Sequence, residues 1–337
     1  MIANLGCYLR RLFNAWDYTG KVPVVHLYIQ TSYCYNRRIL IVTSSYDRTC
    51  DYIIQKYNDV DFFRFDLDCF SKYSISYTKD GFVISNDSDI LYEASCTSIY
   101  YRKPSPENLN GIIDLKYQSF AHKEAYSLLE GIVEAFDGIC LTKPSIMRPA
   151  GNKIFQAKIA QQVGFEAPDY LMTNNADSVK EYQTDEAIVK PLSVGVIQDE
   201  KTKEFVQTNI VDANINLDAL KYSPSYFQLY QKKDYEIRAT FVSSEVFVVK
   251  IESLNEIDWR KSDNKITYSV CEMPDDIYNK CIKFMKLCKM DFGCFDFIVH
   301  NDSWYFLEMN VNGQWAWLEF ETELDISGSI VRYLRGY

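Results

Sequence analysis

Histidine is scarce in this sequence, and paired cysteines are missing. Three histidines occur in 337 residues, and the ten cysteines are scattered from Cys7 to Cys294 without a C-x-x-C pair. Zinc sites and dithiol redox centres need such clusters, so free and mostly buried thiols are the better prediction. No histidine stands in a context typical of a catalytic base, so a Cys-His nucleophilic pair would require a chance encounter in the fold.

A basic excess and long apolar runs are also lacking. The chain has 36 basic against 46 acidic residues and a net charge of -10, which argues against a nucleic-acid partner. No apolar run approaches the roughly 18 residues of a membrane span. Arg10 and Arg11 are not followed by the apolar segment of a signal peptide. We therefore expect a cytoplasmic protein without a membrane or nucleic-acid partner.

Apolar side chains, in contrast, are abundant. Hydrophobic residues make up 47% of the chain and aromatic residues 15%, which is ample for buried cores, and the length suggests about two domains. An apolar run follows Arg38, and an amphipathic helix is predicted for residues 124–136. These features are typical of a small α/β layer, which we expect to end near Cys140.

Two apolar strands near the C-terminus each carry an acid that a buried sheet would not otherwise contain. With a period of two, Phe295 and Phe297 share one face of the first strand, and Asp296 lies on the other. The second strand is predicted to alternate in the same way, with one face formed by Tyr305, Leu307 and Met309 and the other by Phe306, Glu308 and Asn310.

A predicted three-residue turn, residues 301–303, determines how these strands meet. If His300 pairs with Trp304 across it, Asp296 lies directly opposite Glu308, and two carboxylates join the Asn310 amide in one cluster. Magnesium needs only a few protein oxygens when phosphates and water complete its shell, so we predict a magnesium site here. The alternative is a hairpin whose acids are merely solvated.

These residues also carry a family resemblance. The pairing of D-x-x-V (296–299) with F-L-E-x-N (306–310) resembles the metal-binding hairpin of ATP-grasp enzymes. The continuation NGQWAWLE is similar to the branch that matures ribosomal peptides into graspetides, including microviridins. Five motifs between Arg38 and the C-terminus carry the resemblance, so it is more specific than any single match.

The resemblance implies an α/β fold with α+β lobes. Residues 1–36 are expected to form an N-terminal extension of uncertain structure. Residues 37–140 are expected to form a pre-ATP-grasp α/β domain, and residues 141–337 a two-lobed ATP-grasp domain that holds nucleotide, metal and peptide.

Two lysines are assigned to the nucleotide by this resemblance. Lys153 opens a helix that Gly164 ends, where the helix dipole would favour an acid unless a phosphate lies nearby. Lys190 ends the apolar strand AIVK, where a buried lysine needs an anion such as the ATP phosphates. The alternatives are a surface lysine for Lys153 and, for Lys190, a strand-end lysine that reaches solvent.

The adenine is expected beside Gln228, Leu229 and Tyr230, where backbone groups can recognise the purine edge. The resemblance gives Arg238 a phosphate or acyl-phosphate contact, unless Glu236 and Arg238 are simply a surface ion pair. Arg260, in the D-W-R motif, is assigned to the transferred phosphoryl group or the substrate carboxylate.

Two further segments are open to more than one interpretation. Residues 196–206 are predicted to form a hairpin similar to the leader-binding region of microviridin-type ligases, with Asp199 and Glu200 offered to the leader, or else a solvated turn. Arg102 and Lys103, in a segment similar to the family's tyrosine, arginine and proline motif, could face the active-site cleft or a solvated loop. Only Gly195 remains of the family's glycine-rich flap.

The resemblance implies an ATP- and Mg2+-dependent carboxylate ligase. It would phosphorylate Asp or Glu side chains of a precursor peptide that has a leader and an acidic, hydroxyl-rich core. Rings would then close as esters with Thr or Ser, or as amides with Lys. The alternatives are a ligase that adds amino acids to a protein C-terminus or small acid, and a non-catalytic nucleotide- or peptide-binding protein. A monomer and a homodimer both remain open.

Overall fold

The computed structural model describes residues 37–182, 187–193, 195–198, 203–206, 208–211, 215–253 and 265–337. Contacts divide the chain into Met1–Tyr35 and Asn36–Tyr337, and the description below concerns the second unit. The predicted N-terminal extension, the leader-facing acids Asp199 and Glu200, and Arg260 all lie outside the described residues.

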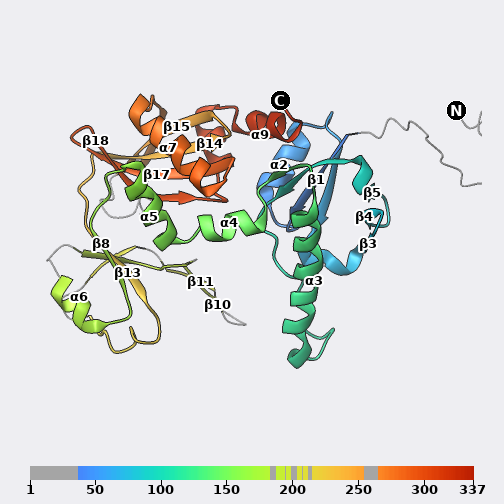
Figure 1. Cartoon of the computed structure of the whole chain (residues 1–337), viewed down its shortest axis with the longest axis horizontal. Helices are drawn as coiled ribbons and strands as arrows, with labels where there is room; N and C mark the ends of the chain where they lie inside the picture. The colour runs from blue at the N-terminus through green and yellow to red at the C-terminus, as the bar shows by residue number, and fades with distance from the viewer. Residues whose placement is uncertain are drawn as a thin grey trace, which may run out of the picture. The chain divides into compact units, whose positions relative to one another are not determined.

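The unit begins with a four-stranded parallel sheet in the order β2-β1-β6-β7. Its middle strand β1 is almost completely buried, as its apolar sequence predicts. Two helices accompany it, and the longer one, α3, runs beside β1 in Figure 1. The elements are β1 (Arg38–Thr43), α2 (Arg48–Lys56), β2 (Phe62–Asp66), β6 (Cys96–Tyr101), α3 (Leu115–Ala135) and β7 (Ile139–Leu141).

An antiparallel three-stranded sheet is inserted between β2 and β6. Its strands follow one another along the chain, and short 3₁₀ segments flank it on both sides. The elements are η1 (Leu67–Lys72), β3 (Ser74–Thr78), β4 (Gly81–Ser85), β5 (Ile90–Tyr92) and η2 (Glu93–Ser95).

The capped helix predicted after Asn152 is confirmed as α5 (Lys153–Val163). The Asn152 side chain accepts hydrogen bonds from the backbone N–H groups of Ile154 and Phe155. Gly164 ends the helix with φ 82°, a left-handed conformation that glycine adopts without strain. A shorter helix, α4 (Pro144–Ala150), leads into it.

A small four-stranded sheet of order β12-β9-β13-β8 follows α5. The predicted AIVK strand is β9, and a separate two-stranded hairpin forms where residues 196–206 predicted one. The elements are β8 (Tyr170–Thr173), α6 (Ala176–Tyr182), β9 (Ala187–Lys190), β10 (Val196–Gln198), β11 (Lys203–Phe205), β12 (Asn209–Ile210) and β13 (Ser225–Leu229).

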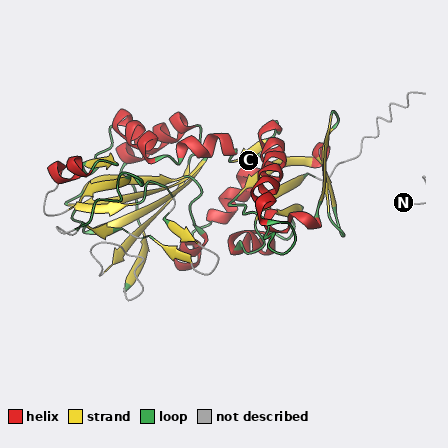
Figure 2. Ribbon diagram, turned by 90° about the horizontal axis from the view of Figure 1, so that it is seen from below, coloured by secondary structure: helices red, strands yellow, loops and turns green. Residues whose placement is uncertain are grey.

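The largest sheet is antiparallel, in the order β16-β15-β14-β17-β18. Helices α5 and α7 pack against one of its faces, where Phe295, Phe297 and Phe306 form the centre of the core. Figure 2 shows helices along this side of the strands. The elements are β14 (Tyr235–Val242), β15 (Glu245–Ser253), β16 (Ile266–Val270), α7 (Asp275–Cys288), β17 (Phe292–His300) and β18 (Ser303–Asn310).

The predicted geometry of the β17–β18 hairpin is wrong in two places. The turn has two residues, Asn301 and Asp302, with φ of 49° and 62°, and His300 pairs with Ser303. Both positive φ values are those of a type I′ turn, which matches the twist of a hairpin better than a three-residue loop. Trp304 instead pairs with Val299.

The second error is the strict alternation of β18. The pairing shifts between Asp296 and Phe297, because Phe297 pairs with Phe306 while Asp296 pairs with Glu308, leaving Leu307 as an extra residue. Because the bulge adds one residue, the strand residues on its two sides no longer alternate in step between the two faces of the sheet. Phe306 therefore lies in the core together with Met309, and not on the face of Glu308.

The described chain ends in two helices, α8 (Ala316–Thr322) and α9 (Ile326–Leu334). The break occurs at Glu323, whose φ is 60°. Trp315 is completely buried, whereas Trp317 is half-buried beside Tyr268, with ring centroids 5.1 Å apart. Trp315 therefore belongs to the core.

The C-terminal helices join the large sheet to the first one. One apolar core contains β1 residues, Val249 of β15, and Trp315 and Ile330. Glu319, only 5% exposed, accepts hydrogen bonds from Tyr52 and Lys56 of α2, both at 2.6 Å. The boundary predicted between residues 140 and 141 thus crosses a shared core, and the domain division stays a prediction.

Two expectations from composition can be compared with the fold. All eight cysteines that the structure describes are free, as predicted, and Cys281 and Cys288 of α7 are buried in the core. Within the described residues, no helix combines the length and the apolar character that a membrane crossing requires.

Candidate active site

The predicted pairing of Asp296 with Glu308 is present, although it arises by a different route. The two-residue turn alone would shift the strands by one position, and the bulge at Leu307 restores the register. Arg238 of β14 is next to Asp296 in the same row, and Cys294 pairs with Asn310 two positions along. Residues that pair across strands share a face, so Arg238, Asp296, Glu308 and Asn310 lie on one side of the sheet.

Arg238 holds Asp296 in place from the neighbouring strand. Its Nη1 donates to both carboxylate oxygens of Asp296, at 2.7 and 2.6 Å. Arg238 is 5% exposed, so the alternative of a surface ion pair is wrong for this residue. Burial opposes the charge of the guanidinium, but the Asp296 carboxylate outweighs it and raises the pKa of Arg238. Glu236, two residues earlier, instead pairs with Lys233.

Lys153 makes the corresponding contact with Glu308. Its Nζ lies 2.5 Å from Oε2 of Glu308, and the two side chains are 18% and 32% exposed. The helix dipole disfavours a positive charge in the first turn of a helix. The Glu308 carboxylate is the negative charge that offsets this cost for Lys153. Asp296 and Glu308 are therefore each paired with a cation from a different element.

The donor set fits magnesium and would not suffice for a metal that needs a complete protein cage. Among the described residues, no group of three or more His, Cys, Asp or Glu side chains is placed to hold an ion. Asp296, Glu308 and Asn310 provide two carboxylates and an amide, and magnesium takes its remaining oxygens from phosphates and water. The assignment of these three ligands stays a prediction.

The second predicted lysine lies in the small sheet. Lys190 Nζ donates to Oε1 of Gln228 on the neighbouring strand at 2.7 Å and lies 5.9 Å from the ring centroid of Tyr226. Gln228 is 2% exposed, and its amide also donates to the Tyr226 hydroxyl at 3.1 Å. Lys190 is thus oriented by polar partners at the strand end.

The predicted adenine segment comprises the end of β13 and the residue after it. The backbone N–H of Leu229 donates to Asp169 O at 2.9 Å, so this amide is already used within the small sheet. A nucleotide base at this position would therefore be recognised by other backbone groups of the segment.

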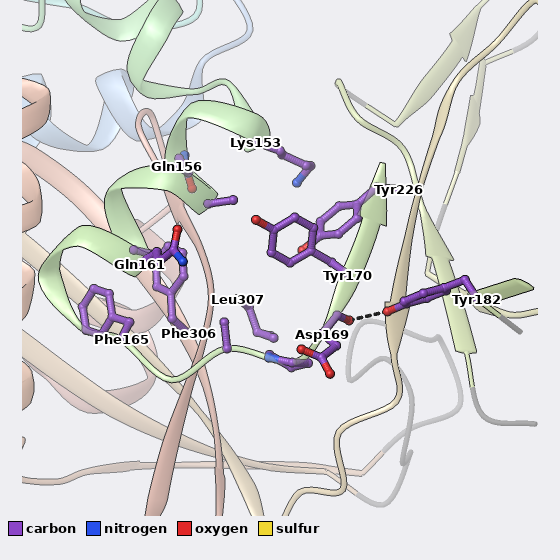
Figure 3. A pocket seen from close by; sticks show the side chains of 14 residues that line it. Lys153, Gln156, Gln161, Phe165, Asp169, Tyr170, Tyr182, Tyr226, Phe306 and Leu307 are labelled. Carbon is purple, nitrogen blue, oxygen red and sulfur yellow. Dashed lines mark hydrogen bonds between the residues drawn. The ribbon is translucent and has the colours of Figure 1, made fainter. Parts of the chain in front are cut away.

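A pocket of about 400 Å³ lies between α5 and β18 on one side and β8 and β13 on the other. Figure 3 shows Lys153 extending from α5 towards the rings of Tyr170 and Tyr226, with Leu307 on the opposite wall. Tyr182 closes the far end, and its hydroxyl donates to Asp169 O at 2.7 Å. Aromatic and aliphatic walls with one cation at the rim are typical of a site for a flat, charged ligand.

Electrostatics connect this pocket to the hairpin. Burial raises the pKa of the Tyr226 phenol, and the charges of Tyr170 and Glu308 add to the shift. Lys153 lines the pocket and pairs with Glu308. The pocket and the carboxylate pair are therefore adjacent parts of one site.

Arg102, which the sequence could not assign to the cleft or to a loop, lies against residues 312–314, directly after the β17–β18 hairpin. Arg102 is completely buried, and its Nη2 donates to Gln314 Oε1 at 2.5 Å. Its Nε lies 3.1 Å from Asp47 Oδ2. An arginine that follows the strand residues Ile99, Tyr100 and Tyr101 and precedes two prolines was the available signal, but the sequence could not show what this arginine contacts.

Lys103, the next residue, has an unusual backbone and environment. Its φ is 46°, which is uncommon for a residue with a side chain. Burial, together with the positive charge of Arg102, lowers the pKa of its ammonium to about 8. The Lys103 side chain is nevertheless exposed, which agrees with the alternative of a solvated loop.

No protein-family model matches the sequence, and no curated protein matches it either. The RiPP-associated ATP-grasp ligase of Chryseobacterium gregarium, solved with ADP, a leader and a core peptide, is 27% identical, with a TM-score of 0.79 over 88% of this chain and 96% of that one. The chain has the fold of a RiPP-associated ATP-grasp ligase.

Two further structures agree with this assignment. The macrocyclase MdnC of Microcystis aeruginosa MRC, bound to precursor peptide MdnA, is 25% identical over 89% of this chain and 100% of that one, with a TM-score of 0.80. The D-alanine–D-alanine ligase of Bacillus anthracis, 15% identical with a TM-score of 0.51 over 82% and 86% of the two chains, shares the fold alone. The ATP-grasp resemblance and the mixed α/β fold class are confirmed.

Proposed function

We propose that this ATP-grasp ligase activates carboxylates of a ribosomal precursor peptide with ATP and closes rings between its side chains. The observation that carries the proposal is the row Arg238, Asp296 and Glu308, because it continues through Lys153 into a pocket suited to a nucleotide. Two structures similar to this chain, at 27% and 25% identity, were solved with precursor-derived peptides.

The nucleotide is the first substrate to consider. Its base would lie against the aromatic walls of the pocket and the segment of Gln228, Leu229 and Tyr230. The phosphates would approach Lys153 and Lys190, and Asp296, Glu308 and Asn310 would hold the magnesium ion. When bound, magnesium neutralises phosphate charge and so favours phosphoryl transfer.

The reaction itself would need no protein nucleophile. A substrate Asp or Glu carboxylate oxygen attacks the γ-phosphorus of ATP, the bond to the β-phosphate oxygen breaks, and ADP leaves. A Thr or Ser hydroxyl, or a Lys amine, then attacks the acyl carbon, loses its proton and expels phosphate. The outcome is an ester or an amide. Arg238, and Arg260 outside the described residues, are proposed to stabilise the transferred charge.

Several elements of the proposal concern the protein as a whole. We place the enzyme in the cytoplasm, where ATP, magnesium and newly made peptide occur together. The proposed partner is a precursor peptide with leader and core, and a homodimer is compatible with the proposal. The N-terminal, pre-ATP-grasp and ATP-grasp divisions at residues 36 and 140 are kept as proposed boundaries.

The decisive experiment uses purified protein, ATP, Mg2+ and the precursor peptide encoded beside the gene. We expect phosphate release that depends on the peptide, and an intact mass that falls by one water per ring. Full activity on free glutamate, or on a protein tail, would instead support the small-acid or tail ligase. Nucleotide binding without turnover of any of these substrates would support the alternative of a non-catalytic nucleotide-binding protein.

A further inference from the structure

Arg102 is a buried charge whose partners come from two distant parts of the chain. Its backbone N–H donates to Val42 O, which continues the pairing of β6 with β1 beyond the strand end. Its guanidinium reaches Thr49 and Gln314 through Nη2, and Asn312 and Gly313 through Nη1, at 3.3, 2.5, 3.3 and 3.4 Å. Arg102 therefore links the first sheet to residues 312–314, which directly follow the hairpin.

Residues 312–314 are in turn held against Arg238. Gln314 O accepts a hydrogen bond from Arg238 Nη2 at 3.4 Å. A Cβ on Gly313 would lie 3.3 Å from Arg238 Nη2 and 2.5 Å from Cys294 Sγ, so only glycine allows this close approach. A continuous series of contacts thus runs from Arg102 through residues 312–314 to Arg238 and Asp296.

We propose that Arg102 is a positioning residue that holds residues 312–314 against Arg238 and so fixes the orientation of the Asp296 carboxylate. The inference rests on the proposed function, because it assumes that Asp296 is a metal ligand. Arg102 touches neither substrate nor metal in this account. It acts entirely through Gln314, Gly313 and Arg238.

The chemistry of the site favours positioning over simple stabilisation. Burying a guanidinium is costly, and apolar side chains of similar volume often stabilise a fold as well or better. Arg102 has one carboxylate partner, Asp47, which is itself committed to capping α2 through the Thr49 and Cys50 amides. The remaining contacts of Arg102 are directional bonds to neutral oxygens, which determine the conformation of residues 312–314.

The test measures how much Mg2+ is needed for ADP to bind, a quantity that does not depend on peptide or turnover. We expect Arg102→Met to raise the half-saturating Mg2+ concentration at least five-fold, and Arg102→Lys to recover part of this effect. Gln314→Ala should shift it in the same direction. Because Gln314 is exposed, that variant remains informative even if Arg102→Met fails to fold.

Arg38→Met is the matched control. Arg38 is also a poorly exposed arginine, and it pairs with Asp61 and Asp89 at 2.8 and 2.6 Å on the first sheet, without any contact to residues 312–314. It should lower the melting temperature and leave the Mg2+ requirement unchanged. An unchanged Mg2+ requirement in folded Arg102→Met or Gln314→Ala, or an equal shift in Arg38→Met, would overturn the inference.

The same set of measurements separates this inference from the proposed function. If the wild type binds Mg2+ and ADP but closes no rings, the ring-forming function fails, and the role of Arg102 is still decided by the titration. If the wild type binds ADP without any Mg2+ dependence, Asp296 is not a metal ligand, and the inference fails together with the metal site.

Discussion

The two acids proposed to bind metal, Asp296 and Glu308, are each paired with a cation that would otherwise be available to phosphate. Arg238 contacts Asp296, and Lys153 contacts Glu308. The two pairs differ in environment, because Arg238 is almost fully buried while Lys153 and Glu308 are partly exposed. A ligand that brings both phosphate and magnesium could therefore exchange partners most readily at Lys153 and Glu308, where water already reaches the pair.

Removal of a proposed metal ligand should abolish the reaction and preserve the fold. Glu308→Gln and Asn310→Ala should each lower peptide-dependent phosphate release at least about 100-fold. Mutation of residues that only hydrogen-bond to a metal ligand already lowers metal affinity or activity about 10–100-fold. Stability should change by about 1 kcal/mol or less, because the Glu308 pair is partly exposed. Phosphate release and thermal melting provide the two measurements.

Glu245→Gln is the control for these variants. Glu245 also pairs with an arginine, Arg332, at 3.1 Å, but both side chains are about half exposed on the surface. It should keep full activity. Unfolding of both Glu308→Gln and Asn310→Ala would instead show that this pair of residues is structural.

Lys103 should contribute weakly to the pH dependence of stability, because its side chain is exposed and solvent screens its charge. Its pKa is about 8 in the folded chain against an ordinary 10.5, so the unfolded chain binds more protons between these values. The charged lysine therefore slightly weakens the fold below about pH 8, and this cost disappears as the pH rises towards 10.5. Lys103→Met should be slightly more stable than the wild type at pH 7, with the difference shrinking by pH 10.

Chemical denaturation at several pH values would check this prediction. A difference between Lys103→Met and the wild type that does not change with pH would show that the charge of Lys103 does not affect stability. If a substrate anion binds beside Lys103, adding the precursor peptide should also bring the wild type closer to the variant at pH 7, because an anion stabilises the charged form.

The β17–β18 turn is the clearest test at the level of a single element. Asn301 and Asp302 both have positive φ, and Asn-Gly is the preferred sequence for such a turn. Asp302→Gly should raise the free energy of unfolding by about 1 kcal/mol or less, because glycine adopts this conformation without strain. Thermal melting measures the gain, and activity should not change.

Asp87→Gly is the matched control, since Asp87 is exposed in a loop and is not among the positive-φ residues. Glycine there adds only freedom to the unfolded chain, so the variant should be neutral or slightly less stable. Equal effects at Asp87 and Asp302 would contradict the I′ geometry of the turn.

This hairpin also shows which features sequence could predict. The caps of α5 were predictable because Asn152 and Gly164 act locally, through their own side chain or lack of one. The opposition of Asp296 and Glu308 was predicted from a wrong turn, and the bulge at Leu307 corrected the error. A bulge depends on packing against neighbouring elements, so periodicity along one strand could not reveal it.

Contacts between distant segments were the least predictable. Arg102 and Gln314 are 212 residues apart, and nothing in either local pattern indicates that they meet. Glu319 is similar, since the same motif that suggested the family contains a buried acid held by α2. The family resemblance identified the segment, but its partners depend on how the first sheet packs against the C-terminal helices.

At the level of the whole molecule, the β10–β11 hairpin distinguishes a peptide ligase from a small-acid ligase. Among the described residues its two strands pair with each other, in a sheet separate from the two that hold the proposed nucleotide residues. If the hairpin binds a leader, affinity for the precursor should reside mostly there, and Asp199→Lys with Glu200→Lys should weaken it. ATP handling without peptide should survive.

The physical reason is that binding energy from a remote segment positions the reacting carboxylates and is not part of the chemistry. A core peptide without its leader should therefore react at least about ten-fold more slowly, which corresponds to roughly 1.4 kcal/mol. Leader supplied separately should restore part of the rate if it also stabilises the closed form of the enzyme. Turnover of core peptide with and without leader measures this, and Asp80→Lys with Asp87→Lys controls for a general effect of charge. Equal rates with and without leader would rule out the leader-dependent peptide function and favour the simpler ligase.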